Sequence, residues 1–327
     1  MIRTRMTELL GCRLPILSGG MGSGLASPRL VAAIARAGAF PVLGTANEPL
    51  ARIRANIDAV KASVTGPFGV NVLLIPGSYP DASADDVIGV LLEAGVKFVE
   101  TAGRSPRQHI ERLKAAGVRI VHKCSRMRDA LSAERAGVDA VALLAYEGAG
   151  HISAEYVGQL VQIQLAVAQL KLPVIAAGGF ASGQAILGAL AMGAEGVLLG
   201  TRFVLTEESP MHLETKRALL RASVTDTAVL AAGSGDDVRV FATDAARDME
   251  LREKKGELAY AEVKKLFNAN KGAALHEGKY HDGTFPVGQA IALIDDLPSV
   301  ADLVARLERE MLQGRSRVES LFASATA

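Results

Sequence analysis

The chain has 327 residues, of which 49% are hydrophobic and 4% aromatic, which allows one large α/β domain with an aliphatic core and an accessory element. Its 36 basic and 35 acidic residues are spread along the sequence without a basic tail or stripe, which argues against a nucleic-acid partner. No apolar run reaches the roughly 18 residues of a membrane span, and the first residues have no apolar signal-peptide core, so we expect a cytoplasmic protein.

Strand and helix patterns alternate over the first 206 residues. Short apolar runs predict eight strands, at residues 14–17, 40–45, 68–75, 98–101, 119–124, 140–147, 173–179 and 196–203. Helical patterns between them fall at residues 27–38, 49–64, 85–94, 105–116, 126–136 and 153–170, and a further helix begins at residue 182. Ser27 followed by Pro28 predicts an N-cap with proline at the first helical position.

Four of the predicted helices end in the same way. Ala-Gly-Val at residues 94–96, 116–118 and 136–138, and Met-Gly-Ala at 192–194, place a glycine just beyond the helix and shortly before a strand. The spacing of these units suits successive β/α repeats around a barrel. We therefore predict an α/β fold, a (β/α)₈ TIM barrel. A doubly wound sheet is the alternative, although its glycine fingerprint normally follows the first strand.

The strand pattern disappears after residue 206. Residues 207–283 are charged and helical in pattern, which predicts a small helical subdomain inserted after the eighth strand. Residues 285–293 are apolar again, and residues 299–321 form a long amphipathic helix with its apolar side chains on one face. The predicted division is therefore a barrel at 1–206, a helical subdomain at 207–283 and a C-terminal segment at 284–327 that packs back on the barrel.

The seventh and eighth predicted strands both end in glycine, which suggests that they end at a ligand. Gly178, Gly179 and Gly200 leave backbone N–H groups free to approach a phosphate, and the helix that begins at Ser182 adds its positive end. Two tight turns without a ligand are the alternative for either stretch alone. The last two strands of a (β/α)₈ barrel commonly hold a phosphate, which favours the ligand.

Two polar residues lie within or near the ends of predicted strands. Asn71 interrupts an apolar strand, so it contacts either a ligand or a partner in the core. Lys123 either pairs with Glu100 or Glu147 or stabilises negative charge on a ligand. The alternation of side chains along a strand points Cys124 away from Lys123, which argues against a nucleophilic cysteine.

His151 follows two glycines at the end of the sixth predicted strand. A histidine titrates near neutral pH, so His151 is a candidate general acid or base; an exposed or helix-capping histidine is the alternative. Cys12 and Cys124 lack the spacing of a metal site, and no HExxH motif or histidine cluster is present, so we expect no metal.

Seven short motifs appear in order along the chain. They are GGM at 19–21, PFGVN at 67–71, VETAG at 99–103, HKC at 122–124, GAGH at 148–151, AGGFA at 177–181 and GTRF at 200–203. With these motifs the chain resembles the nitronate monooxygenase (2-nitropropane dioxygenase-like) family of FMN-dependent barrels. That family includes NADH:quinone reductases and is similar to flavin enoyl-acyl-carrier-protein reductases. Ser18 stands where the family commonly has a glutamine before GGM, so the resemblance does not identify the substrate.

The resemblance implies an FMN across the barrel mouth. It places the phosphate at the glycine-ended strands, the ring near the GGM loop and Asn71, the cation of Lys123 at the pyrimidine end and His151 on the substrate side. The implied cofactor-binding residues are Gly20, Met21, Gly22, Asn71, Lys123, Ala149, Gly150, Ala177, Gly178, Gly179, Gly200 and Thr201. The implied catalytic residue is His151.

The implied activity is the oxidation of nitronates or nitroalkanes with oxygen. An NAD(P)H:quinone reductase or an enoyl reductase is the alternative within the resemblance, with NAD(P)H as a co-substrate. Outside it, a non-redox sugar-phosphate isomerase or synthase would use the same glycines, and a flavin-binding protein without turnover is a third interpretation. We expect a small-molecule substrate, and a homodimer is left open.

Overall fold

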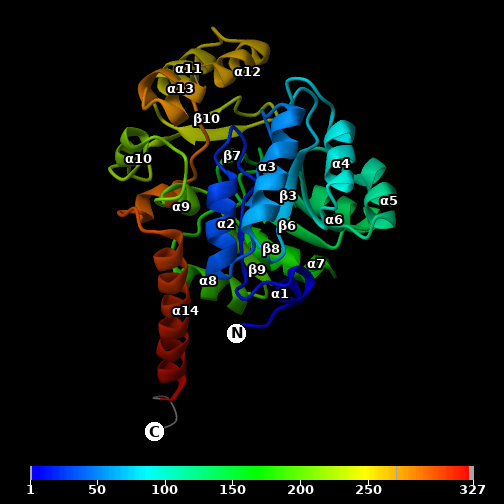
Figure 1. Ribbon diagram of the computed structural model, residues 1–327. Helices are drawn as coiled ribbons and strands as arrows, with labels where there is room; N and C mark the ends of the chain where they lie inside the picture. The colour runs from blue at the N-terminus through cyan, green and yellow to red at the C-terminus, as the bar shows by residue number, and fades with distance from the viewer. Residues whose placement is uncertain (1, 270, 324–327) are drawn as a thin grey trace.

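The computed structural model describes residues 2–269 and 271–323, and eight parallel strands form a nearly closed barrel (Figure 1). Their order around the barrel is β1-β9-β8-β6-β5-β4-β3-β2. A parallel bridge between Leu17 and Phe40 joins β1 to the residues before β2. The strands are β1 (Ile16–Ser18), β2 (Val42–Leu43), β3 (Gly69–Leu73), β4 (Phe98–Ala102), β5 (Arg119–Cys124), β6 (Ala140–Leu144), β8 (Val174–Ala177) and β9 (Gly196–Leu199). The predicted (β/α)₈ barrel is confirmed.

Helices surround the strands, as the alternating pattern predicted. They are α2 (Pro28–Ala37), α3 (Leu50–Ser63), α4 (Ala84–Glu93), α5 (Arg107–Ala115), α6 (Met127–Ala136), α7 (Gln159–Gln169), α8 (Gly183–Ala191) and α9 (Thr201–Val204). Ser27 caps α2 and Ser182 caps α8 through their side chains, as expected. The glycines that end four of these helices, Gly95, Gly117, Gly137 and Gly193, all have positive φ angles.

Two of the predicted boundaries that were wrong have a clear local cause. Helix α7 begins at Gln159 rather than at residue 153, because the carboxylate of Glu147 accepts the Gln159 N–H and fixes the helix start there. The eighth strand ends at Leu199, and Thr201 begins the short helix α9, in which the N–H groups of Phe203 and Val204 donate to the carbonyl of Gly200.

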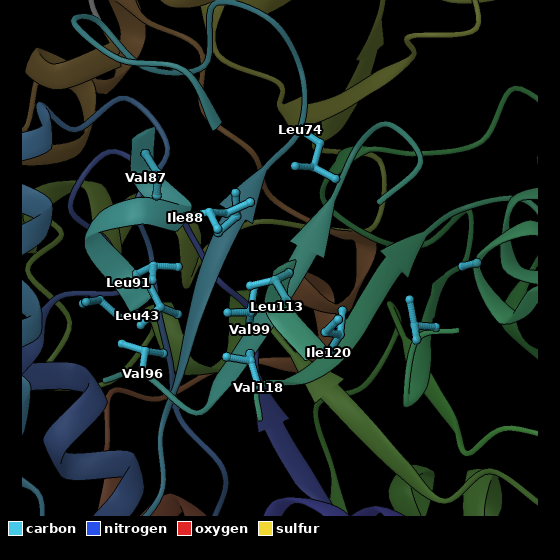
Figure 2. Packing of buried hydrophobic residues seen from close by; sticks show 14 of the residues in the cluster. Leu43, Leu74, Val87, Ile88, Leu91, Val96, Val99, Leu113, Val118 and Ile120 are labelled. Atoms are coloured by element: carbon cyan, nitrogen blue, oxygen red, sulfur yellow. The ribbon is translucent and has the colours of Figure 1, made fainter. Parts of the chain in front are cut away.

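Aliphatic side chains fill the layer between the strands and the outer helices. In Figure 2, Val87, Ile88 and Leu91 of α4 belong to the same buried cluster as Val99 of β4 and Ile120 of β5. Both faces of a parallel barrel strand are buried, which explains why these strands read as continuous apolar runs. The packing holds the strand ends, and the loops that follow them, in fixed positions.

A short helix that the sequence pattern did not predict closes the N-terminal end of the barrel. Helix α1 (Arg5–Leu10) is capped by Thr4, and Met6 and Leu10 are fully buried in the barrel interior. A Cβ at Gly196 would lie 2.2 Å from the Met6 sulfur, so glycine is needed for this close approach. The barrel interior is therefore filled at its N-terminal end, and the free space lies at the opposite, C-terminal mouth.

The segment after the barrel is mixed rather than purely helical, contrary to our expectation. It contains α10 (Leu213–Leu219), β10 (Thr227–Leu230), β11 (Val238–Phe241), α11 (Asp244–Lys254), α12 (Tyr260–Asn268), α13 (Lys271–His276) and η1 (Tyr280–Asp282). Strand β11 pairs with β10 on one side and with β7 (Gly150–His151) on the other, in antiparallel register. The pairing ties the loop after β6 to this accessory segment. The domain boundaries at 206 and 283 stay a prediction.

The C-terminal segment packs back on the barrel through η2 (Gln289–Leu293) and α14 (Val300–Ala323). The apolar face expected for the long helix is buried at Val300, Leu303, Val304, Leu307 and Met311. Gly183 of α8 lets this helix approach, since a Cβ there would lie 2.1 Å from the Leu307 carbonyl oxygen. The end of α14 extends beyond the barrel (Figure 1). Within the described residues, no helix has the length and apolar character to cross a membrane.

Candidate functional site

A cavity of about 680 Å³ lies at the C-terminal ends of the barrel strands, beneath the accessory segment. It is bounded by the loops after the strands and by residues of α12 and α13. All but one of the residues expected at the site line it: Gly20, Met21, Gly22, Asn71, Lys123, Ala149, Gly150, His151, Gly178, Gly179, Gly200 and Thr201. The structure thus brings six segments, distant in sequence, to one cavity.

Ala177 is the expected site residue that does not line the cavity. It is fully buried, and its side chain belongs to the barrel interior together with Leu198 and Ile175. As the last residue of β8, it faces inward, whereas the chain turns toward the cavity only at Gly178. The structure therefore places the Ala177 side chain in the barrel interior rather than at the cavity, and a role for Ala177 in binding the cofactor stays a prediction.

Backbone rather than side chains forms the wall at the ends of β8 and β9. Gly178 and Gly179 have φ angles of +98° and +83°, which residues that carry a side chain rarely adopt. A Cβ at Gly178 would lie 2.9 Å from the backbone nitrogen of Gly148 in the loop after β6. Thr201 accepts a hydrogen bond from the Gly288 N–H at 3.1 Å, so the C-terminal segment is held at this wall.

A buried carboxylate organises the opposite part of the cavity. Glu100 is 2% exposed, and one of its oxygens accepts hydrogen bonds from the Asn71 amide at 2.8 Å and from the Gly20 N–H at 3.2 Å. Its other oxygen lies 3.2 Å from the ammonium nitrogen of Lys123. The two alternatives to a ligand, a core partner for Asn71 and an ion pair between Lys123 and Glu100, are therefore both present. Asn71 and Lys123 nevertheless also line the cavity.

Glycine is required at position 20 by this network. A Cβ at Gly20 would lie 2.2 Å from the Asn71 Cβ and 2.6 Å from the Glu100 carboxylate. Glu100 therefore fixes the GGM loop, the buried amide and the cation relative to one another. Sequence reasoning had named Glu100 only as an ion-pair partner, and its position in register with Asn71 on adjacent strands is the signal for the larger role.

Two other titratable groups of β5 carry no charge at neutral pH. Burial lowers the pKa of His122 to about 4, and its Nδ1 shares a hydrogen bond with the Thr101 hydroxyl at 2.9 Å. Burial also raises the pKa of the Cys124 thiol, which agrees with our argument against a nucleophile. No group of three His, Cys, Asp or Glu residues in the described ranges could hold a metal ion.

His151 is oriented by the accessory segment. Its Nδ1 lies 3.0 Å from an oxygen of Asp236, which follows β10 in the turn to β11, and the other Asp236 oxygen accepts a hydrogen bond from the Tyr260 hydroxyl. The hydrogen bond from His151 is the main reason that the pKa of Asp236 is lowered to about 2. All three residues line the cavity. The His151 Nε2, on the other side of the ring, remains for a ligand.

Sequence reasoning missed Asp236 and Tyr260. The available signal was the stretch Gly233 to Asp237, GSGDD, between two short alternating apolar runs, which is typical of a hairpin turn. The hydrogen bond to Asp236 raises the pKa of the Tyr260 hydroxyl to about 12, so it acts as a donor at neutral pH. The Asp236 carboxylate is therefore ionised at neutral pH and accepts two hydrogen bonds, one from His151 and one from Tyr260.

One face of the accessory segment covers the cavity. The residues that line it recur every three or four positions, as expected for one side of a helix. We call this set the roof stripe: Tyr260, Val263, Lys264, Phe267 and Asn268 of α12, and Lys271 at the start of α13. A helical pattern was predicted for residues 207–283, but the contact of this stretch with the cavity was not.

Comparison with known proteins gives a consistent result. Residues 3–310 match the nitronate monooxygenase family. A Rhodococcus jostii protein named (3aS,4S,5R,7aS)-5-hydroxy-7a-methyl-1-oxo-octahydro-1H-indene-4-carboxyl-CoA dehydrogenase is 31% identical, with 98% of each chain covered. A nitronate monooxygenase of Paraburkholderia phytofirmans is 31% identical over 94% of this chain and 95% of its own. The structure of FabK from Thermotoga maritima superposes with a TM-score of 0.91 at 32% identity, covering 98% of this chain and 100% of that one.

Proposed function

Since the chain belongs to the nitronate monooxygenase family of flavin-dependent oxidoreductases, we propose that it binds FMN at the barrel mouth and oxidises nitronates or nitroalkanes with oxygen. The observation that carries the proposal is the shared cavity. An oriented histidine, a buried cation pair and a wall of bare backbone line the same space. A redox cofactor, a base and an anion-stabilising group are what oxidation of a carbon acid requires.

The residues present fit FMN. Gly20, Gly22 and Gly178 each lie so close to a neighbouring segment that a Cβ would clash, and they leave flat, side-chain-free walls. In this proposal Gly178, Gly179, Gly200 and Thr201 hold the phosphate through backbone N–H groups and a hydroxyl. The GGM loop and Asn71 would contact the ring, and Lys123 would lie at its pyrimidine end. Bound FMN would supply two-electron redox chemistry that side chains cannot.

The protein's own contribution is proton transfer and charge stabilisation. A neutral nitroalkane must lose a carbon-bound proton before oxidation, and in this proposal the His151 Nε2 accepts it. Asp236 holds the ring in orientation and stabilises the imidazolium that forms, as in other carboxylate–histidine pairs. A nitronate is already an anion, so it needs positioning more than a base.

A second candidate function is oxidation or reduction of an acyl thioester. Two observations favour it: the similarity to a protein named as a carboxyl-CoA dehydrogenase, and a cavity that continues along the roof stripe away from His151. Carbon acids next to a nitro group or a thioester carbonyl need the same base. The two functions therefore differ in the length and charge of the substrate rather than in the reacting groups.

Anaerobic reduction of the holoenzyme tests the proposal. The protein should be yellow, and propyl-2-nitronate should bleach its flavin absorbance, with NADH, NADPH and an acyl-CoA run in parallel. Oxygen should then restore the colour. A colourless protein that does not take up FMN would support a non-redox barrel instead, and reduction by NADH alone would favour a quinone reductase.

Substitution of Gly178 by alanine tests the phosphate site. The positive φ angle costs alanine about 1–3 kcal/mol, and the added Cβ meets backbone rather than a flexible side chain. We expect FMN to bind roughly tenfold more weakly, as measured by fluorescence titration of the apoprotein. Gly188→Ala in α8 is the matched control, because nothing lies within 4 Å of its Cβ position. Full FMN affinity in Gly178→Ala would exclude this wall as the phosphate site.

A further inference from the structure

The roof stripe connects two chemically different ends of the cavity. At one end the Tyr260 hydroxyl contacts Asp236, which orients His151. At the other end lies Lys271, and the apolar side chains of Val263 and Phe267 lie between them. Because an α-helix rises 1.5 Å per residue, Phe267 lies about 10 Å along the stripe from Tyr260. The Lys271 ammonium nitrogen is 3.8 Å from the centre of the Phe267 ring.

Lys271 is a cation that forms no ion pair with any carboxylate among residues 2–269 and 271–323. Its ammonium group donates to the Asn268 side-chain oxygen at 3.1 Å and lies over the Phe267 ring, and neither partner is charged. No ion pair joins it to a carboxylate in the part of the chain that the structure describes. By contrast, Lys123 pairs with Glu100 and Arg126 pairs with Asp129 on the same cavity.

An uncompensated, partly buried ammonium is costly unless a ligand supplies the missing charge. Burial lowers the pKa of Lys271 to about 8, so the group is still largely protonated at neutral pH. The neighbouring Lys264 differs, because its charge acts on Asp236 and helps to lower the pKa of that carboxyl. The negative charge that Lys271 lacks must therefore come from outside the described residues.

We propose that Lys271 binds an anionic group, a carboxylate or a phosphate, at the far end of an elongated substrate. The apolar body of that substrate lies along Val263 and Phe267, and its reacting carbon lies at His151, at the other end of the roof stripe. The inference rests on the proposed function for which end reacts, but the anion subsite itself does not depend on it. The substrate class is an amphiphilic carbon acid rather than a small nitroalkane.

Binding of chain-matched probes to the holoenzyme tests the subsite without turnover. Decanoate, decyl phosphate and decanol are titrated by calorimetry into the wild type, Lys271→Met, Lys271→Arg and Lys265→Met. Lys265 lies on α12, is exposed and does not line the cavity, so Lys265→Met controls for the loss of one lysine charge. Flavin occupancy and circular dichroism confirm that each variant is folded.

We expect the anionic probes to bind the wild type at least tenfold more tightly than decanol. Lys271→Met should remove that advantage and leave decanol unchanged, while Lys271→Arg and Lys265→Met should retain it. The tighter of decanoate and decyl phosphate identifies the anionic group. Equal binding of all three probes, or anion binding unaffected by Lys271→Met, would overturn the inference. Loss of nitronate-dependent flavin reduction with a preserved Lys271 effect would instead overturn the proposed function alone.

Discussion

Substitution of Lys123 by methionine should lower the reduction potential of the bound flavin and weaken its retention. The ammonium nitrogen lies 3.2 Å from Glu100 and lines the cavity where the pyrimidine end of the ring is proposed to lie. Reduced flavin accumulates negative charge there, so removing a fixed cation disfavours the reduced form. We expect a shift on the order of 30 mV or more, because about 30 mV corresponds to a tenfold change for two electrons.

Glu100 allows a test of opposite sign. Glu100→Gln removes the carboxylate that neutralises Lys123 and keeps a hydrogen-bonding side chain for Asn71 and Gly20, so the potential should rise. Lys123→Met leaves Glu100 buried without its cation, so the free energy of unfolding should also fall. The double variant should recover stability, and its potential should lie between those of the two single variants. Spectroelectrochemical titration measures the reduction potential of the flavin. A potential that shifted in the same direction in both single variants would contradict the assignment.

Loss of the base proposed at His151 should slow the turnover of neutral nitroalkanes far more than the turnover of nitronates. His151→Ala and Asp236→Asn should each lower kcat/KM for neutral nitroalkanes on the order of 100-fold, because proton removal loses its acceptor or that acceptor's orientation. Turnover of the preformed nitronate should fall much less. Steady-state oxygen consumption with each form measures the ratio directly.

Tyr260→Phe is the graded control for this prediction. It keeps the aromatic ring on the roof stripe and removes only the hydroxyl that donates to Asp236. We expect a loss of a few-fold, because Asp236 keeps its hydrogen bond to His151. If His151→Ala slowed nitroalkane and nitronate turnover equally, His151 would be a positioning group rather than a base.

The barrel could be predicted because its signals are local. Each parallel strand is a short apolar run, and each helix end carries its own cap, as at Ser27, Ser182 and Gly137. The glycine-ended strands marked one wall of the cavity for the same reason. A ligand that approaches bare backbone requires glycine at a definite position, and that requirement is visible in the sequence.

The accessory sheet could not be predicted because its contacts are long-range. Strand β7 has two residues, and its partner β11 lies more than 80 positions along the chain, so neither strand shows a pattern long enough to detect. Asp236 therefore looked like one more acidic residue in a charged segment. Ala177 lies in the barrel interior rather than at the cavity for a different reason. The alternation of side chains along β8 decides which residues face the interior, and a match to a motif does not.

The three-stranded sheet has a consequence for how such enzymes diverge. The barrel contributes a single two-residue strand to it, while residues 227–268 contribute its other strands, Asp236 and most of the roof stripe. One contiguous stretch thus carries both the group that orients His151, the proposed proton acceptor, and one wall of the cavity. On the proposed function, recombination of that stretch between relatives would exchange substrate preference in one genetic step and leave the strand ends at which FMN is proposed to bind untouched.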